Sequence, residues 1–230
     1  MKIGILMTGH LPERLIAERG DLDRLFPQLF ADDGLTFEAW DVEGMVFPDG
    51  PADADGWLVT GSKHGAYEDH PFIPPLEAFI RACYAADVPL VGICFGHQIV
   101  AQALGGTVER FEGGWSLGRK AYAIEGAGPL HLNAWHRDQV TRPPREARTL
   151  GTTEGCAHAV LAYGDRILTV QPHPEFDAGV IDHFVTTRRD TGLYPPDRMD
   201  AAEAALALPL DNARMARAIA RFFRTREFHV

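Results

Sequence analysis

Cysteine and long apolar runs are both scarce in this chain. Three cysteines occur, Cys83, Cys94 and Cys156, and none belongs to a CxxC pair, so the sequence predicts neither a disulfide framework nor a cysteine-based zinc site. The first apolar run covers only residues 3–7, which is too short for a signal-peptide core or a membrane span. We therefore expect a cytoplasmic protein with no membrane role.

Acidic residues outnumber basic residues in this chain. Lysine and arginine total 22 against 32 aspartates and glutamates, which gives a formal net charge of -10. Such a surface repels nucleic-acid phosphates and anionic lipids, so nucleic acid is not an expected partner. With 230 residues and 46% hydrophobic residues, the chain has the size and composition of a single globular domain over 1–230.

Short apolar runs alternate with helix-like segments in the first half of the chain. The predicted strands cover 3–7, 37–42, 57–60 and 89–93, and the predicted helices cover 21–30 and 74–86. Strands that are apolar throughout, rather than at every second residue, indicate a parallel sheet covered by helices on both faces. The sequence thus predicts an α/β fold, a three-layer α/β/α sandwich with a mostly parallel, flavodoxin-like central sheet.

Strand-like segments separated by turns dominate the second half. They cover 106–111, 120–124, 148–152, 158–162 and 166–170, and they predict antiparallel strands added to the parallel sheet. A helix is expected over 176–189, and residues 199–223 are mostly helical with a break at Pro209. We interpret 185–230 as a C-terminal helical extension that packs on its own domain.

The segment Val91-Gly-Ile-Cys-Phe-Gly-His-Gln98 carries the sharpest chemical signal. A strand runs into Gly-x-Cys-x-Gly and a helix-like stretch follows, which is the arrangement of a nucleophile elbow with sulfur in place of a hydroxyl. Glycines two residues before and after Cys94 remove side chains that would collide in so sharp a turn. The start of a helix favours a thiolate, and the N–H of Phe95 is placed to receive the oxyanion of a tetrahedral intermediate. The alternative, a buried core cysteine, is our interpretation of Cys83 and Cys156.

A second candidate segment, Gln171-Pro-His-Pro-Glu-Phe176, directly follows a predicted strand. Residues two apart in an extended chain point the same way, so His173 and Glu175 share one face. The two prolines hold the residues before them in extended conformations. The pair supplies a general acid and its orienting carboxylate for a Cys94 thiolate. The alternative is a surface loop with two polar side chains.

Signals for metals and for nucleotide-binding domains are missing. His64, His97, His131 and His136 lack the paired spacing of a zinc or iron site, so the sequence predicts no metal. The chain also contains no P-loop and no SGGxDS run of an ATP-pyrophosphatase. We therefore expect no ATP-dependent acceptor domain within it.

Together, Gly92-Ile-Cys-Phe-Gly-His-Gln98 and His173-Pro-Glu175 resemble the motifs of class I glutamine amidotransferase domains, in particular the GMP-synthetase-like branch. The resemblance covers residues 40–176. It implies that Cys94 forms a triad with His173 and Glu175 that hydrolyses a γ-glutamyl amide such as glutamine. It implies no metal or organic cofactor.

Further stretches extend the resemblance to the rest of the site. The loop Leu58-Val-Thr-Gly-Ser62 is similar to one whose backbone completes the oxyanion hole, and Gly113–Gly118 is similar to a segment that borders the pocket. The segment Trp135–Val140 resembles a His-x-Asp-x-Val stretch that holds the amino-acid end of the substrate. The resemblance therefore implies an oxyanion hole at Gly61 and Phe95, and substrate contacts at Gln98, Trp115, Ser116, Arg137 and Asp138.

Two departures leave the reaction partner open. Thr60-Gly-Ser-Lys-His stands where amidotransferases that serve a synthase often have Gly-Gly-Pro, and no acceptor domain is recognisable. The leading hypothesis is γ-glutamyl amide hydrolysis through a glutamyl thioester, either by a free-standing hydrolase or by a glutaminase subunit that delivers ammonia to a separate synthase. A hypothesis from another class is a redox or stress sensor with a reactive elbow cysteine, against which the His173 segment argues.

Overall fold

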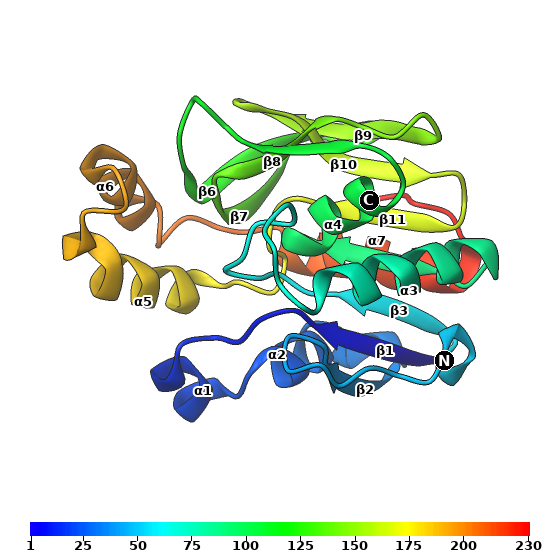
Figure 1. Cartoon of the computed structure of the whole chain (residues 1–230). Coiled ribbons are helices and arrows are strands. Elements are labelled where there is room, and N and C mark those ends of the chain that lie inside the picture. The colour runs from blue at the N-terminus through cyan, green and yellow to red at the C-terminus, as the bar shows by residue number, and fades with distance from the viewer.

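The computed structural model describes residues 1–230 and contains a sheet of nine strands in the order β2-β1-β3-β4-β11-β10-β9-β6-β7, together with a separate pair, β5 and β8. From β2 to β11, neighbouring strands are parallel, and from β11 to β7 they are antiparallel. Figure 1 shows the parallel strands in the lower part of the molecule and the antiparallel strands above them. The predicted combination of a parallel core with added antiparallel strands is confirmed.

The parallel strands form the centre of the molecule. They are β1 (Lys2–Met7), β2 (Thr36–Asp41), β3 (Gly56–Val59), β4 (Leu90–Ile93) and β11 (Ile167–Val170). Every residue of β3, β4 and β11 is buried. Burial on both faces explains why these strands are apolar throughout, since helices cover each side of the sheet.

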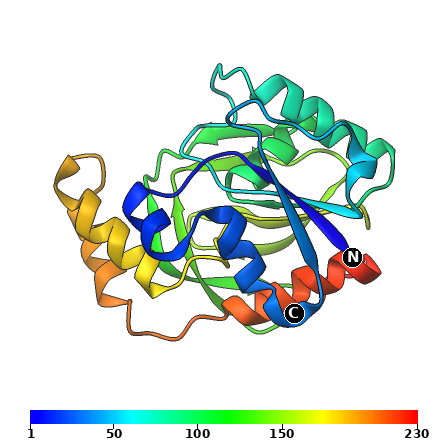
Figure 2. The same ribbon diagram turned by 90° about the horizontal axis from the view of Figure 1, so that it is seen from below.

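Two pairs of helices cover the sheet (Figure 2). On one face lie α3 (Ile73–Ala85) and α4 (Phe95–Ala103), and on the other lie α2 (Leu22–Leu29) and α7 (Asn212–Thr225). The core is correspondingly divided into two apolar clusters, one with the side chains of α3 and α4 and one with those of α2 and α7. The three-layer sandwich is therefore confirmed, and no helix has the length and apolar character that crossing a membrane requires.

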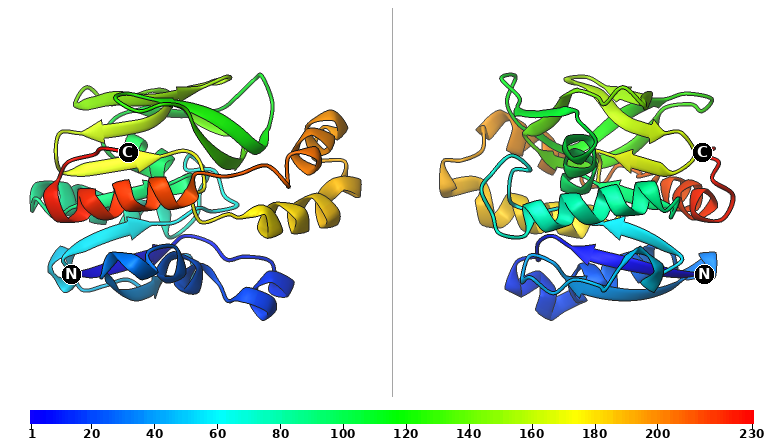
Figure 3. Two further views of the ribbon diagram at one scale, coloured as in Figure 1. Left: turned by 180° about the vertical axis from the view of Figure 1, so that it is seen from behind. Right: turned by 45° about the vertical axis from the view of Figure 1, so that its right-hand side comes forward.

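Three further helices lie at the end of the sheet where the parallel strands terminate. They are α1 (Glu13–Arg19), α5 (Ala178–Arg188) and α6 (Pro196–Ala204), and Figure 3 shows α5 and α6 projecting beyond the sheet. The expected break near Pro209 falls between α6 and α7. Within the predicted extension, α7 buries Met215, Ile219, Phe222 and Phe223 in the core, so this amphipathic helix is one of the covering layers.

The antiparallel strands contain the main errors of the sequence-based prediction. Their bounds are β5 (Thr107–Arg110), β6 (Ser116–Ile124), β7 (Leu130–His136), β8 (Asp138–Arg142), β9 (Ala147–Thr153) and β10 (Cys156–Tyr163). We predicted neither β7 nor β8, nor helix α1. Asn133 and His136 are buried in β7 although they are polar, so the strand lacks the apolar pattern that a buried strand normally displays.

Candidate active site

The predicted elbow is formed between β4 and α4. Cys94 has φ 53° and ψ -100°, a strained combination for a residue with a side chain. A Cβ atom on Gly92 would lie 2.4 Å from the carbonyl oxygen of Gly96, and one on Gly96 would lie 2.2 Å from that of Val59. Both positions therefore exclude any other residue without backbone movement, which is the physical reason for the Gly-x-Cys-x-Gly pattern.

A backbone hydrogen bond joins the loop after β3 to the elbow. The N–H of Gly96 donates to the carbonyl of Thr60 at 3.0 Å, and the hydroxyl of Thr8 donates to the carbonyls of Thr60 and Gly61 at 3.0 and 3.1 Å. A Cβ atom on Gly61 would lie 2.8 Å from Cε1 of His173 and 3.8 Å from Cβ of Cys94. The backbone of Gly61 thus lies directly against Cys94 and His173.

His173 and Glu175 form a buried pair. His173 Nδ1 lies 2.6 Å from Glu175 Oε1, and the Glu175 side chain is fully buried. The N–H of His173 donates to the carbonyl of Asn133 at 2.9 Å, which ties the segment to β7. The ring of Phe176 stacks on the imidazole at 4.0 Å with an interplanar angle of 4°. Backbone, carboxylate and aromatic ring together hold the imidazole in one orientation.

The charges around His173 favour its protonated form. Burial by itself lowers the pKa of His173, but the negative charge of Glu175, followed by that of Cys94, raises that pKa to about 10. An imidazolium beside a cysteine at a helix start is the environment in which a thiolate is stabilised. Cys94 and His173 are thus electrostatically coupled.

Gln171, which the sequence motifs did not single out, also contacts Cys94. Gln171 Nε2 lies 3.5 Å from the sulfur of Cys94, and Gln171 Oε1 accepts from Gln98 Nε2 at 3.2 Å. Gln98 Nε2 also donates to the carbonyl of Asp138 at 2.8 Å. The signal was present in the sequence, since Gln171 is two residues before His173 and shares its face in an extended chain.

Cys94 faces a cavity of about 370 Å³ at the end of the sheet where α5 lies. Most of the predicted site residues line it, namely Gly61, Cys94, Gln98, Trp115, Arg137, Asp138, His173 and Glu175. Ser116 and Phe95 do not line it, and the Phe95 side chain is buried in the core. As the first residue of α4, Phe95 has a backbone N–H without an intrahelical acceptor, so only its backbone is available to the site.

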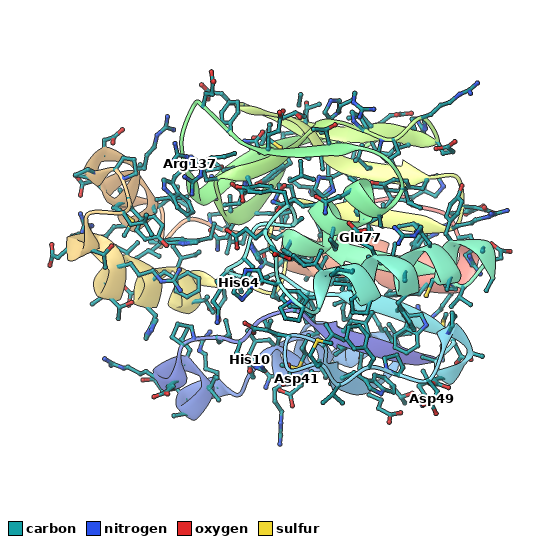
Figure 4. All side chains as sticks on the ribbon, in the orientation of Figure 1. His10, Asp41, Asp49, His64, Glu77 and Arg137 are labelled. Atoms are coloured by element: carbon teal, nitrogen blue, oxygen red, sulfur yellow. The ribbon has the colours of Figure 1, made fainter.

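The C-terminal segment supplies part of the cavity wall that no motif predicted. Trp115 packs against Tyr194 with ring centroids 4.6 Å apart, and Tyr194 packs against Trp135 at 5.3 Å. The Arg188 guanidinium lies 3.9 Å from the centroid of the Phe184 ring. Figure 4 shows Arg137 on the side of the antiparallel strands and α6, with His64 below it. An aromatic and basic wall therefore borders one side of the cavity.

Cys94 is expected to react with a glutamine-like electrophile far faster than Cys83 or Cys156. Burial raises the pKa of both Cys83 and Cys156 to about 12, and neither lines the cavity. Mass spectrometry of tryptic peptides after timed alkylation measures the three rates. Equal labelling of the three cysteines would contradict the idea of an activated thiolate at the elbow.

The sandwich with its elbow is the fold found in solved structures of glutamine amidotransferases. A glutamine amidotransferase of Methylobacillus flagellatus has the same fold, with a TM-score of 0.78 and 19% identity over 100% of this chain and 96% of that one. A glutamine amidotransferase of Thermotoga maritima gives a TM-score of 0.73 at 21% identity, over 98% of this chain and 97% of that one. These similarities concern the fold.

The sequence comparisons identify the family. The model of the glutamine amidotransferase class-I family matches residues 30–189, so this chain belongs to that family. A glutamine amidotransferase-like protein of Schizosaccharomyces pombe is 30% identical over 72% of this chain and 70% of its own length. Gamma-glutamyl peptidase 2 of Arabidopsis thaliana is 28% identical over 70% of this chain and 71% of its own. A GMP synthase of Aeropyrum pernix is 39% identical over 72% of this chain but only 30% of its own.

Proposed function

We propose that this chain hydrolyses γ-glutamyl amides, with Cys94 as nucleophile, His173 as general acid and base, and Glu175 as the group that orients His173. The observation that carries the proposal is the position of Cys94, which faces a cavity from a strained elbow and is coupled to the buried His173–Glu175 pair. Acyl transfer through a covalent intermediate requires a nucleophile, a neighbouring acid–base group and a third group that orients the acid–base group.

The reaction begins with attack of the Cys94 thiolate on the γ-carbonyl carbon. The N–H groups of Gly61 and Phe95 stabilise the resulting oxyanion. His173 donates its proton to the nitrogen as the carbon–nitrogen bond breaks, so an amine or ammonia departs and a glutamyl thioester remains. Neutral His173 then takes a proton from water as the water attacks the thioester, and the carbon–sulfur bond breaks. Glutamate leaves, and the thiolate and the imidazolium are restored.

The charged side chains of the cavity fit an amino-acid substrate. Arg110, Arg137 and Arg188 line it, and none of them forms a salt bridge with a carboxylate of the protein. We assign Arg137 to a substrate carboxylate and Asp138 to the α-amino group of the glutamyl end, since each offers the opposite charge. Gln98 contributes by placing the Asp138 backbone and Gln171.

The substrate is a γ-glutamyl peptide or amide larger than glutamine. In support of this choice, the cavity extends from Cys94 to Arg188, Leu193 and Tyr194, so side chains of the C-terminal segment are available to contact a larger leaving group. Its volume of about 370 Å³ falls within the range of small-molecule sites, roughly 300–1,000 Å³. Relatives named gamma-glutamyl peptidases agree with this assignment.

The test is steady-state glutamate release by the isolated protein from glutamine and from several γ-glutamyl dipeptides. We expect a higher kcat/KM for the dipeptides, because contacts to the larger leaving group lower the barrier relative to free enzyme and substrate. Turnover that requires an added synthase would instead identify a glutaminase subunit. If no compound is hydrolysed while peroxide rapidly oxidises Cys94, the redox-sensor hypothesis is favoured.

Gln171 is a further catalytic residue in this proposal, because its amide touches the reacting sulfur. Gln98 donates to Gln171 Oε1, so the Gln171 amide must present its N–H to Cys94 rather than its oxygen. A hydrogen bond to a charged group contributes about 1.5–3 kcal/mol. Gln171 thus stabilises the thiolate before attack and again when the thioester breaks.

Gln171→Met is expected to lower kcat/KM by about 10- to 100-fold, the rate equivalent of that hydrogen bond. The rate of Cys94 alkylation near neutral pH should fall as well, which separates an effect on the thiolate from one on substrate binding. The matched control is Gln102→Met, since Gln102 lies on α4 but donates to the Ala66 carbonyl and to Glu77. Unchanged alkylation in Gln171→Met would remove Gln171 from the mechanism.

A further inference from the structure

Three side chains with metal-binding atoms meet in the loop between β3 and α3. The candidate ligand atoms of His64, Glu68 and His70 all lie within 4.8 Å of one another. Glu68 Oε2 lies 2.9 Å from His70 Nε2 and 3.8 Å from His64 Nδ1. We propose that these three residues form a binding site for a divalent transition-metal ion of the Zn²⁺ type, separate from the catalytic triad.

The distances suit the coordination of zinc. Bonds from Zn²⁺ to histidine nitrogen and carboxylate oxygen are about 2.0–2.2 Å, so tetrahedral ligand atoms lie roughly 3.3–3.5 Å apart. The two Glu68 distances bracket that value, and the ligand atoms of the two histidines lie within 4.8 Å of each other. Two imidazoles and one carboxylate leave a fourth position open. Imidazole ligands favour Zn²⁺ or Ni²⁺ over Mg²⁺ and Ca²⁺, which require oxygen ligands.

The orientation of His64 is already that of a metal ligand. Its Nε2 lies 2.8 Å from Glu43 Oε1, so in the neutral ring the N–H sits on Nε2 and donates to that carboxylate. The lone pair is then on Nδ1, the nitrogen nearer to Glu68. Metal-bound histidines commonly donate their other N–H to a carboxylate, which holds both the tautomer and the ring orientation.

Packing keeps the two imidazoles in place. The centroid of the buried Phe72 ring lies 5.8 Å from those of both His64 and His70, and the two histidine rings lie 3.9 Å apart. His64 and Glu68 also line the cavity of Cys94, and Figure 4 shows His64 at the same end of the molecule as Arg137. An ion bound here would restrict the motion of the loop that carries Gly61. The spacing His-x3-Glu-x-His differs from the paired spacing that is typical of zinc and iron sites.

The experiment is a Zn²⁺ titration of the full chain in competition with a chromophoric chelator, carried out in Cys94→Ala so that the thiolate does not bind the ion. One equivalent is expected to bind, and excess Mg²⁺ should not displace it. His64→Ala and His70→Ala should each lose this binding. Glu43→Gln should weaken it by about 10- to 100-fold, because the orienting carboxylate is lost.

The matched control is His183→Ala, which removes a histidine on α5 and should bind Zn²⁺ as tightly as the parent. Circular dichroism and thermal unfolding of each variant without metal establish that the fold is retained. Binding that persists in both His64→Ala and His70→Ala would overturn the proposal, and so would the absence of stoichiometric binding to the parent. In that case Glu68 and the two histidines form only an ion-pair cluster.

Discussion

Cys94→Ala is expected to abolish glutamate release from every γ-glutamyl substrate. In the proposed mechanism the sulfur forms the covalent bond to the glutamyl group, and no other nucleophile lies at the elbow. Loss of a triad nucleophile costs on the order of 10⁶ in kcat, which places the variant at the background of the assay. The measurement is kcat by coupled detection of glutamate, with the best γ-glutamyl dipeptide from the substrate panel.

The control for this variant is Cys83→Ala, which removes a cysteine from the core of α3 and leaves the cavity untouched. It should keep the activity of the parent, and both variants should unfold cooperatively. Hydrolysis retained in Cys94→Ala and lost in Cys83→Ala would exclude the elbow as the active centre.

Glu175→Gln is expected to lower kcat by about 100-fold and to change its dependence on pH. The charge of Glu175 is the largest influence that raises the pKa of His173, so the uncharged amide lets this pKa fall. The imidazolium is then lost at a lower pH, and the basic limb of the rate profile moves toward neutrality. A positioned general acid and base contributes 10²–10⁴ to the rate, and the glutamine side chain preserves part of the orientation.

The measurement is a set of pH–rate profiles for the parent, for Glu175→Gln and for Glu146→Gln, which neutralises an exposed carboxylate that does not line the cavity. The control should superimpose on the parent. A Glu175→Gln profile that falls in height while keeping its basic limb would mean that Glu175 only orients His173 and does not set its protonation.

The α/β architecture followed from local patterns, and the structure confirms it. The strands β3, β4 and β11 are buried along their whole length. Their uninterrupted apolar runs therefore indicate a parallel sheet. β7 could not be predicted in the same way, because the polar Asn133 in it is buried. Its carbonyl accepts from the N–H of His173 and its amide donates to the carbonyl of Phe176. Such a residue is satisfied only by partners far along the chain, which no periodicity reveals.

The candidate site also contains residues that sequence motifs predicted and residues that only the folded structure brings to it. Cys94 was predicted because backbone geometry restricts its neighbours, as the collisions at Gly92 and Gly96 demonstrate. His173 and Glu175 were predicted because residues two apart in an extended segment share one face. These constraints fix residue types within one short segment and therefore leave a motif. The aromatic and basic wall that includes Arg188 and Tyr194 leaves none. That wall depends on how the segment after α5 packs against Trp115 and Trp135 at the end of the sheet, where burial and charge are decided by the folded chain as a whole.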